Sequence, residues 1–358
     1  MFKSADIWLP ALLRRKVPTL GGRKVQVLLA VCDHFEPFHQ SGGNRDIAIE
    51  RMQRWVGRFP FVQGAGAGED GRPPVHTFFY PCEQYDPGVV DLLEKLCNNG
   101  AGETEIHLHH GEDSYQSFVD QIETGKEDFS RHGLLPKDPR GTKRYAFIHG
   151  NWAITNSHPE GKHCGVPNEI KALLDTGCYA DLTMPSAPDP CQSRIVNSIY
   201  HAQDVASSRS HDTGILAKAG QVPPSNHLLF IQGPLALNWG RRKFGILPRL
   251  ENADLTLANP PTLQRFKLWQ DTAVHIEGKR DWVFIKLHTH GCNPKNIEMH
   301  LGEDLLQFYS EVSNYCKQSD KSDLYFVTAR EMANIALAAM EGKDGNPSQY
   351  RDYYYKLG

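Results

Sequence analysis

The sequence predicts an α/β fold with a parallel sheet or barrel, on two observations. Apolar runs of strand length, such as residues 24–32 (KVQVLLAVC) and 282–288 (WVFIKLH), are continuous rather than alternating, which is typical of strands buried on both faces. Segments with a helical spacing of apolar residues follow several of these runs. Strands that alternate with helices form right-handed βαβ units, which bring parallel strands into one sheet.

Strand and helix alternate along most of the chain. The expected strands are residues 24–32, 75–80, 105–109, 144–149, 179–184, 228–232 and 282–288. The expected helices are residues 46–59, 87–97, 168–176, 302–317 and 329–341. Start and stop signals support the bounds of helix 87–97, because Pro87 suits the first turn of a helix and Gly100 follows its end.

One domain over residues 1–358 is expected, since no repeat of fixed period and no linker rich in Pro or Ser divides the chain. Residues 203–226 and 238–280 are weakly periodic and are expected to be loop insertions, and residues 302–341 a C-terminal helical segment. The 39 Lys and Arg against 42 Asp and Glu give a net charge of −3, which offers no basis for nucleic-acid binding. No apolar run approaches the ~20 residues that a membrane-spanning helix needs.

The N-terminal segment and the cysteines predict a cytoplasmic protein. The first apolar stretch is interrupted by Pro10 and precedes its basic residues, the reverse of a secretory signal. The eight cysteines are scattered without a CxxC pair in a chain long enough to fold without disulfides, which fits reduced thiols. The oligomeric state is left open.

Ionisable side chains collect at the ends of five expected strands. They are Asp33 and His34, then His107, His109, His110 and Asp113, then His149, then Asp181, and finally His288 and His290. In a parallel barrel the carboxyl ends of the strands form the rim that carries functional groups. Imidazole and carboxylate groups are the ligands of zinc and similar divalent ions, so the pattern predicts a metal-assisted hydrolase. The alternative for any one of these histidines is a structural role as a hydrogen-bonded group.

The segment EIHLHHGED holds the densest group of candidate ligands. Strand alternation puts His107 and His109 on one face and His110 on the other. Asp113 lies four residues after His109, so the two would share a face if the chain enters a helix after Leu108. The alternative is a solvated loop rich in His and Glu.

The order of these motifs resembles the polysaccharide deacetylases with the NodB-homology domain, within the glycoside hydrolase/deacetylase superfamily. HTFFYP, the helix to Cys97, Gly100 and EIHLH follow the order and spacing of the family's second strand, helix, glycine turn and third strand. VLLAVCDHFEP resembles the family's first motif, a strand ending in two acidic residues, with only Asp33 remaining. FIKLHTHG resembles the final motif, whose histidine protonates the leaving group. The resemblance covers residues 24–300 in order.

This resemblance implies a distorted (β/α) barrel of about seven parallel strands and a divalent metal, with Zn²⁺ as the expected ion. The implied metal ligands are His34, His107, His109 and Asp113, and His288 is the implied general acid. Asp33 is the general base if His34 is the ligand, whereas the reverse assignment, with Asp33 on the ion, leaves no obvious base in the first strand. The expected substrate contacts are His110, His149, Trp152 and His290. The ligand set stays open, because His107 or His110 could take the place of Asp113.

The expected function is metal-dependent hydrolysis of an amide, the removal of an N-acyl group from an amino sugar or a related carbohydrate. The partner is thus an acylated-amine substrate. One alternative is a non-catalytic carbohydrate-binding relative, which the missing second acid of the first motif suggests. The other is a hydrolase of a different C–N bond.

Overall fold

The computed structural model describes residues 3–17, 24–163 and 166–358, and its centre is a parallel sheet. Seven strands of this sheet pair in parallel in the order β12-β1-β2-β3-β4-β5-β8. Their bounds are Val25–His34 (β1), His76–Pro81 (β2), Gly102–Leu108 (β3), Tyr145–His149 (β4), Cys178–Asp181 (β5), Leu228–Ile231 (β8) and Trp282–Thr289 (β12). The α/β class and the parallel order are therefore confirmed.

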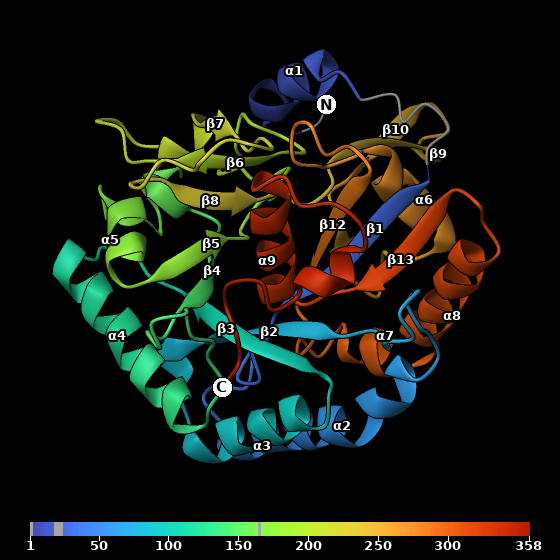
Figure 1. Cartoon of the computed structure of the whole chain (residues 1–358). Helices are drawn as coiled ribbons and strands as arrows, with labels where there is room; N and C mark the ends of the chain where they lie inside the picture. The colour runs from blue at the N-terminus through green and yellow to red at the C-terminus, as the bar shows by residue number, and fades with distance from the viewer. Residues whose placement is uncertain (1–2, 18–23, 164–165) are drawn as a thin grey trace.

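The strands curve around helix α9 (Ala329–Met340), which stands at the centre of Figure 1. The two end strands approach each other, because a Cβ atom added to Gly233, just after β8, would lie 2.2 Å from the carbonyl oxygen of Lys286 on β12. Among the described residues, however, no ladder of hydrogen bonds joins β8 to β12, and β8 pairs instead with the antiparallel strand β6 (Ile199–Ala202). The sheet curves like the expected barrel but stays open between these two strands.

Each strand has an outer face, covered by helices, and an inner face, which packs on α9. The helices on the outer face are Arg45–Gln63 (α2), Pro87–Asn98 (α3), Tyr115–Arg131 (α4), Glu169–Asp175 (α5) and Glu303–Lys317 (α8). On β1, Leu29 and Val31 join this outer core, whereas Leu28 and Ala30 join the inner core with α9. Because residues of a strand alternate between faces, this pattern places His34 on the inner face of β1 and Asp33 on its outer face.

The structure contains helices and strands in regions where the sequence predicted loops, and a strand in the C-terminal segment that was expected to be helical. The remaining bounds are Ala5–Arg14 (α1), Ile215–Leu216 (β7), Ala236–Lys243 (β9), Leu247–Glu251 (β10), Asp254–Leu255 (β11), Leu263–Asp271 (α6), Ile297–Leu301 (α7) and Ser322–Phe326 (β13). The expectation of a loop over residues 238–280 is wrong, because this range contains α6 and most of the β9–β10 hairpin. The segment 302–341 is also not helical throughout, because β13 pairs with the first half of β1. Within the described part of the chain, none of the helices combines the length and the apolar character needed to cross a membrane.

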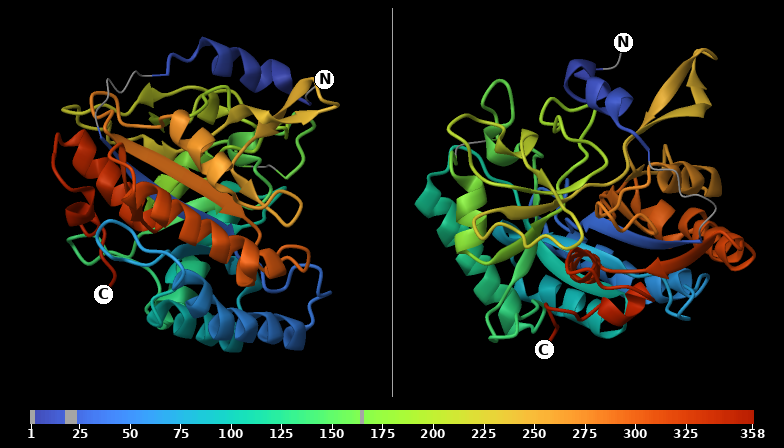
Figure 2. Two further views of the ribbon diagram at one scale, coloured as in Figure 1. Left: turned by 90° about the vertical axis from the view of Figure 1, so that its right-hand side faces the viewer. Right: turned by 45° about the horizontal axis from the view of Figure 1, so that its top comes forward.

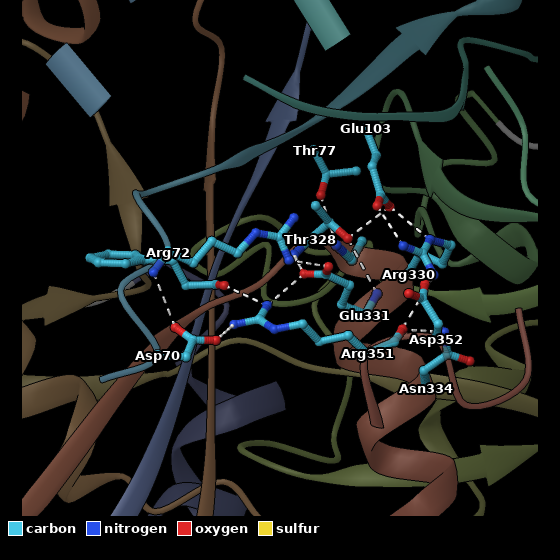
Figure 3. A network of polar contacts seen from close by, with 12 residues as sticks. Asp70, Arg72, Thr77, Glu103, Thr328, Arg330, Glu331, Asn334, Arg351 and Asp352 are labelled. Atoms are coloured by element: carbon cyan, nitrogen blue, oxygen red, sulfur yellow. Dashed lines mark hydrogen bonds and ion pairs between the residues drawn. The ribbon is translucent and has the colours of Figure 1, made fainter. Parts of the chain in front are cut away.

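A buried polar network holds α9 against the sheet (Figure 3). Arg330 donates from Nε and Nη2 to the carboxylate of Glu103 on β3, at 2.9 and 2.6 Å. Thr328 caps α9 and donates to the same carboxylate at 2.8 Å, while Oγ1 of Thr77 accepts from the backbone N–H of Ala329 at 2.7 Å. Because Thr77 and Glu103 lie near the amino ends of their strands, α9 closes that end of the sheet. The histidine-rich strand ends lie at the opposite end.

Candidate metal centre

A cluster of imidazole and carboxylate groups lies at the carboxyl ends of β1 and β3. His34, Glu36 and His107 each offer one ligand atom, and these three atoms all lie within 4.8 Å of one another. All three residues are buried. His34 ends β1 on its inner face, Glu36 follows two residues later, and His107 is the last inward residue of β3. Two imidazoles and a carboxylate converging on one point form a suitable donor set for a zinc ion.

Three further histidines surround this His34–Glu36–His107 cluster. The ring centroid of His290 lies 4.6 Å from that of His34, and the ring centroid of His288 lies 6.4 Å from it. The ring of His109 lies 4.6 Å from that of His107. Strand β12 pairs with β1 along its length, which brings His288 and His290 to His34 from a distant part of the chain. The structure therefore gathers five histidines that the sequence singled out.

The hydrogen bonds of His107 define its tautomer. Its Nδ1 lies 3.0 Å from the carbonyl oxygen of Ile148, and because a carbonyl can only accept, Nδ1 carries the hydrogen. Nε2 of the same ring lies 3.3 Å from Oε1 of Glu36, so it donates to that carboxylate when it carries a hydrogen and presents a lone pair to it when it does not. A lone pair and a carboxylate at this distance need a cation or a proton between them. An Nδ1 hydrogen held by a carbonyl is also the arrangement that orients metal-binding histidines.

His34 has the least satisfied side chain of the cluster. It is 1% exposed, and neither of its ring nitrogens has a hydrogen-bond partner among the described residues. Burial, with the neighbouring rings of His290 and His107, lowers the pKa of His34 well below its usual value. The ring is therefore neutral, the form that binds metal ions. Because a buried polar group without a partner is costly, a ligand for these nitrogens would stabilise the site.

Glu36 is the charged member of the cluster. Its carboxylate lies 2.9 Å from Nδ1 of His39 and 3.5 Å from Nε2 of His109. Burial alone would raise the pKa of Glu36, but hydrogen bonds from His107, His109 and His39 lower it below its usual value. Burial would likewise lower the pKa of His109, but its hydrogen bonds to Glu36 and Glu83 raise it to about 9. Glu36 is therefore an anion that protonated His109 holds in position.

His288 and His290 form the side of the site that strand β12 contributes. Nδ1 of His288 has no hydrogen-bond partner among the described residues, and its Nε2 lies 3.9 Å from a carboxylate oxygen of Asp254. Burial and the nearby charge of Lys286 lower the pKa of His288 well below its usual value, and burial also lowers the pKa of His290. Trp152 lies next to this side, with its ring centroid 6.4 Å from that of His290.

Asp33 does not face the cluster, which corrects its expected place beside His34. Adjacent residues of a strand point to opposite faces, so Asp33 lies on the outer face of β1. There its Oδ1 accepts from the backbone N–H of Gly291 at 2.7 Å, and its Oδ2 lies 3.7 Å from Nδ1 of His76. Burial raises the pKa of Asp33. Glu36 occupies the position near the histidines that the sequence reasoning gave to Asp33.

Asp113 also lies apart from the cluster, because the chain does not enter a helix directly after β3. Helix α4 begins two residues beyond Asp113, so Asp113 and His109 do not share a helix face. Oδ1 of Asp113 instead accepts from Ser117 and Gln121, each at 3.0 Å. Its Oδ2 lies 3.4 Å from Nδ1 of His110. The expected pairing of His109 with Asp113 on one ion is thus corrected.

His110 and His149, expected to contact substrate, form a second buried group with Glu169. Their ligand atoms lie within 4.8 Å of one another, with Nε2 of His110 3.3 Å from Oε1 of Glu169. Nδ1 of His149 accepts from the backbone N–H of Asn151 at 3.1 Å, so the neutral ring carries its hydrogen on Nε2. The other oxygen of Glu169 accepts from the backbone N–H of Thr155 at 2.5 Å. Because His149 presents a hydrogen rather than a lone pair, this group is the weaker candidate for an ion.

Three acidic residues and one histidine of these groups were not among the expected site residues: Glu36, His39, Glu83 and Glu169. For Glu36 the sequence carries a usable signal, because it follows His34 by two residues in an extended stretch and so lies on the same side. Glu83 and Glu169 come from other segments, and only the folded chain brings them to these histidines.

Fold and cluster together define an α/β protein with a candidate metal centre at the carboxyl end of a parallel sheet. No protein-family model and no curated protein sequence matches the chain. Among solved structures it is similar to the 4-α-glucanotransferase from Thermococcus litoralis, with 10% identity and a TM-score of 0.43. The match covers 87% of this chain and 40% of that protein. A likeness of this size carries no argument about activity, so the functional proposal depends on the site itself.

Proposed function

We propose that the chain is a metal-dependent hydrolase that removes an N-acyl group from an amino sugar or a related carbohydrate. His34, Glu36 and His107 would hold the ion, and Zn²⁺ fits their nitrogen-rich donor set best. The observation that carries the proposal is the convergence of His107 Nε2 on the Glu36 carboxylate beside the unpartnered ring of His34. The sequence resemblance to NodB-type deacetylases supplies the reaction class.

A divalent ion in such a site supplies Lewis-acid chemistry, because it polarises a carbonyl group and lowers the pKa of water. The chain's own residues would move the protons. His290 is a neutral imidazole beside His34 and would accept a proton from the attacking water. His288, neutral at rest, would first take up a proton from solvent and then pass it to the departing amine, and the nearby Asp254 carboxylate would stabilise the protonated form. His109 would keep Glu36 oriented through their ion pair.

One observation favours a second candidate, a carbohydrate-binding protein without hydrolytic activity. Glu36 is engaged by three histidines, and Asp33 faces away, so a separate carboxylate base is lacking among the described cluster residues. Hydrolysis then depends on histidine as the base. The two candidates differ in whether a bound sugar releases its acyl group.

The test is acetate release from oligomers of N-acetylglucosamine by the zinc-loaded full chain. We expect release that stops in a chelator and returns with zinc, and that His34→Ala abolishes. His227→Ala, which alters a histidine on the loop before β8, is the matched control and should retain activity. Oligomer binding without release, equal with and without chelator, would favour the binding protein. Release that is insensitive to chelator would contradict the metal-dependent mechanism.

A further inference from the structure

Helix α1 and the β9–β10 hairpin present large apolar side chains to solvent, and we call them the α1–hairpin surface. The exposed fraction is 71% for Leu13 on α1, 82% for Phe244 and 74% for Ile246 at the hairpin tip, and 58% for Trp239 on β9. The hairpin projects from the body of the molecule next to α1 (Figure 2). Large apolar side chains that gather at one exposed place mark an interaction site.

A groove of about 910 Å³ separates α1 from the hairpin. The larger apolar residues of its lining are Leu9, Pro10, Leu13, Phe244, Leu247 and Pro248. On its other side α1 is anchored, because Trp8 is fully buried and packs with Ala187 and Leu235. The helix is therefore fixed to the body of the protein while its groove side stays open. The surface is built from ordered elements.

Basic residues are frequent in the two segments that form this surface, and Arg14 and Lys243 line the groove. Residues 3–17 and 236–250 contain eight Lys or Arg and one acidic residue, Asp6, an excess of seven positive charges in a chain whose net charge is −3. Two of the basic groups flank the exposed rings, with the Arg242 guanidinium 6.0 Å from the centroid of Trp239 and the Lys243 ammonium 5.3 Å from that of Phe244. The surface thus combines apolar tips with a positive rim.

We propose that the α1–hairpin surface docks on a membrane that carries anionic lipids. Apolar side chains of a peripheral protein enter the boundary between headgroups and acyl chains, and lysine and arginine beside them pair with lipid phosphates. Tryptophan favours the same interfacial region. An apolar tip within a positive rim matches this partner in both chemistry and charge, whereas a dimer of identical copies would bring its excess of positive charge together.

The surface lies on the side of the sheet that carries the histidines. Leu235, which packs under α1, follows β8, and Ala187 follows β5, so both lie beyond the carboxyl ends of parallel strands. His34 and His107 lie at the carboxyl ends of β1 and β3. Docking would therefore bring this end of the sheet toward the lipid headgroups. The proposal does not depend on the proposed hydrolase activity.

The test is co-sedimentation of the full chain with vesicles of phosphatidylcholine alone and of phosphatidylcholine with about one third phosphatidylglycerol. We expect binding to the anionic vesicles only, weakened by added salt. Removing two charges in Arg242→Gln/Lys243→Gln should lower the partition coefficient on the order of 20-fold, since each basic residue contributes about fivefold. Phe244→Ser/Ile246→Ser should abolish binding. Both variants alter exposed side chains, so their thermal unfolding should match the parent chain.

The matched control is Phe61→Ser/Lys95→Gln, which removes an exposed phenylalanine on α2 and an exposed lysine on α3, away from the surface. This variant should bind anionic vesicles like the parent chain. No binding to anionic vesicles, or equal losses in control and hairpin variants, would overturn the proposal. A dimer in light scattering that the hairpin variants dissociate, without any vesicle binding, would assign the surface to a second copy of the chain instead.

Discussion

Glu103 and His107 lie on the same inner face of strand β3, and each meets a charged partner from a distant part of the chain. Glu103, near the amino end of the strand, pairs with Arg330 of α9 at 2.6 Å, while His107, near the carboxyl end, faces Glu36 at 3.3 Å. One strand therefore connects the buried network that closes the sheet with the candidate metal centre. The two ends can be tested separately, the Glu103–Arg330 pair through the stability of the fold and the His107–Glu36 contact through metal binding.

Replacing Arg330 by Leu should destabilise the fold by about 3–5 kcal/mol, because it leaves the buried carboxylate of Glu103 without its counter-charge. Urea unfolding measures this loss. Glu103→Leu/Arg330→Leu, which removes both charges, should recover part of it. The control is Arg131→Leu, since Arg131 is 65% exposed and pairs with Asp128 at the surface, and its loss should cost at most about 1 kcal/mol. Equal costs at both sites would contradict the importance of the buried pair.

His107→Ala and Glu36→Gln should each weaken zinc binding at least about 100-fold, because loss of a group that merely orients a ligand already costs about 10–100-fold. Calorimetric titration of metal-free protein with zinc measures the affinity, and circular dichroism checks that each variant folds. His227→Ala serves as the histidine control and should bind zinc like the parent chain. Unchanged affinity in both cluster variants would exclude their role as ligands.

Asp113→Asn should leave zinc affinity unchanged, although the sequence pattern suggested Asp113 as a ligand. Its carboxylate is used by Ser117, Gln121 and His110 rather than by the His34–Glu36–His107 cluster. The same titration, compared with Glu36→Gln, separates the two assignments. A loss of affinity in Asp113→Asn as large as that in Glu36→Gln would restore the ligand set expected from sequence.

Asp181, at the end of β5, should make stability depend on pH. Burial raises its pKa to about 7, although Thr183 donates to both of its oxygens, at 3.0 and 2.8 Å. The folded state then holds this proton more tightly than the unfolded chain, whose carboxyl titrates near pH ~4. The contribution of protonated Asp181 to the free energy of unfolding is therefore fully present below about pH 4. It decreases as the pH rises and is lost above about pH 7.

Asp181→Asn carries no such proton and should remove this decline. Relative to the parent chain, the variant should gain up to roughly 4 kcal/mol of unfolding free energy between pH 4 and pH 8. Urea unfolding at several pH values gives this difference, in which titrating groups that do not interact with Asp181 cancel because both proteins share them; Lys286, whose pKa Asp181 raises, is the group that does interact. A difference that stays constant with pH would show that the folded-state pKa of Asp181 is not raised.

Local patterns in the sequence account for the strands and for part of the site. The apolar run through Val27 and Leu29 predicts β1, and strand alternation correctly groups His107 with His109. The same alternation, applied to the adjacent pair Asp33 and His34, separates them onto opposite faces, which the resemblance to a two-acid motif obscured.

The start of α4 has only a weak signal in the sequence, and the contacts between distant segments have none. Ser114 and Ser117 form the capping box that starts α4, and their spacing in the sequence marks a helix that begins after Asp113. By contrast, the contact between Glu169 and His110 joins α5 to the loop after β3, and β13 pairs with only part of β1. Such contacts depend on how separate segments pack together, which no local pattern in a single sequence specifies.

The most direct test of the metal centre is anomalous scattering at the zinc absorption edge from crystals of the zinc-loaded full chain. The account predicts one strong peak within about 2.0–2.3 Å of ring nitrogens of His34 and His107 and of a carboxylate oxygen of Glu36. Crystals of Glu36→Gln should show a weaker peak or none. A peak only between His110, His149 and Glu169, or no ordered zinc in the loaded protein, would contradict the assignment.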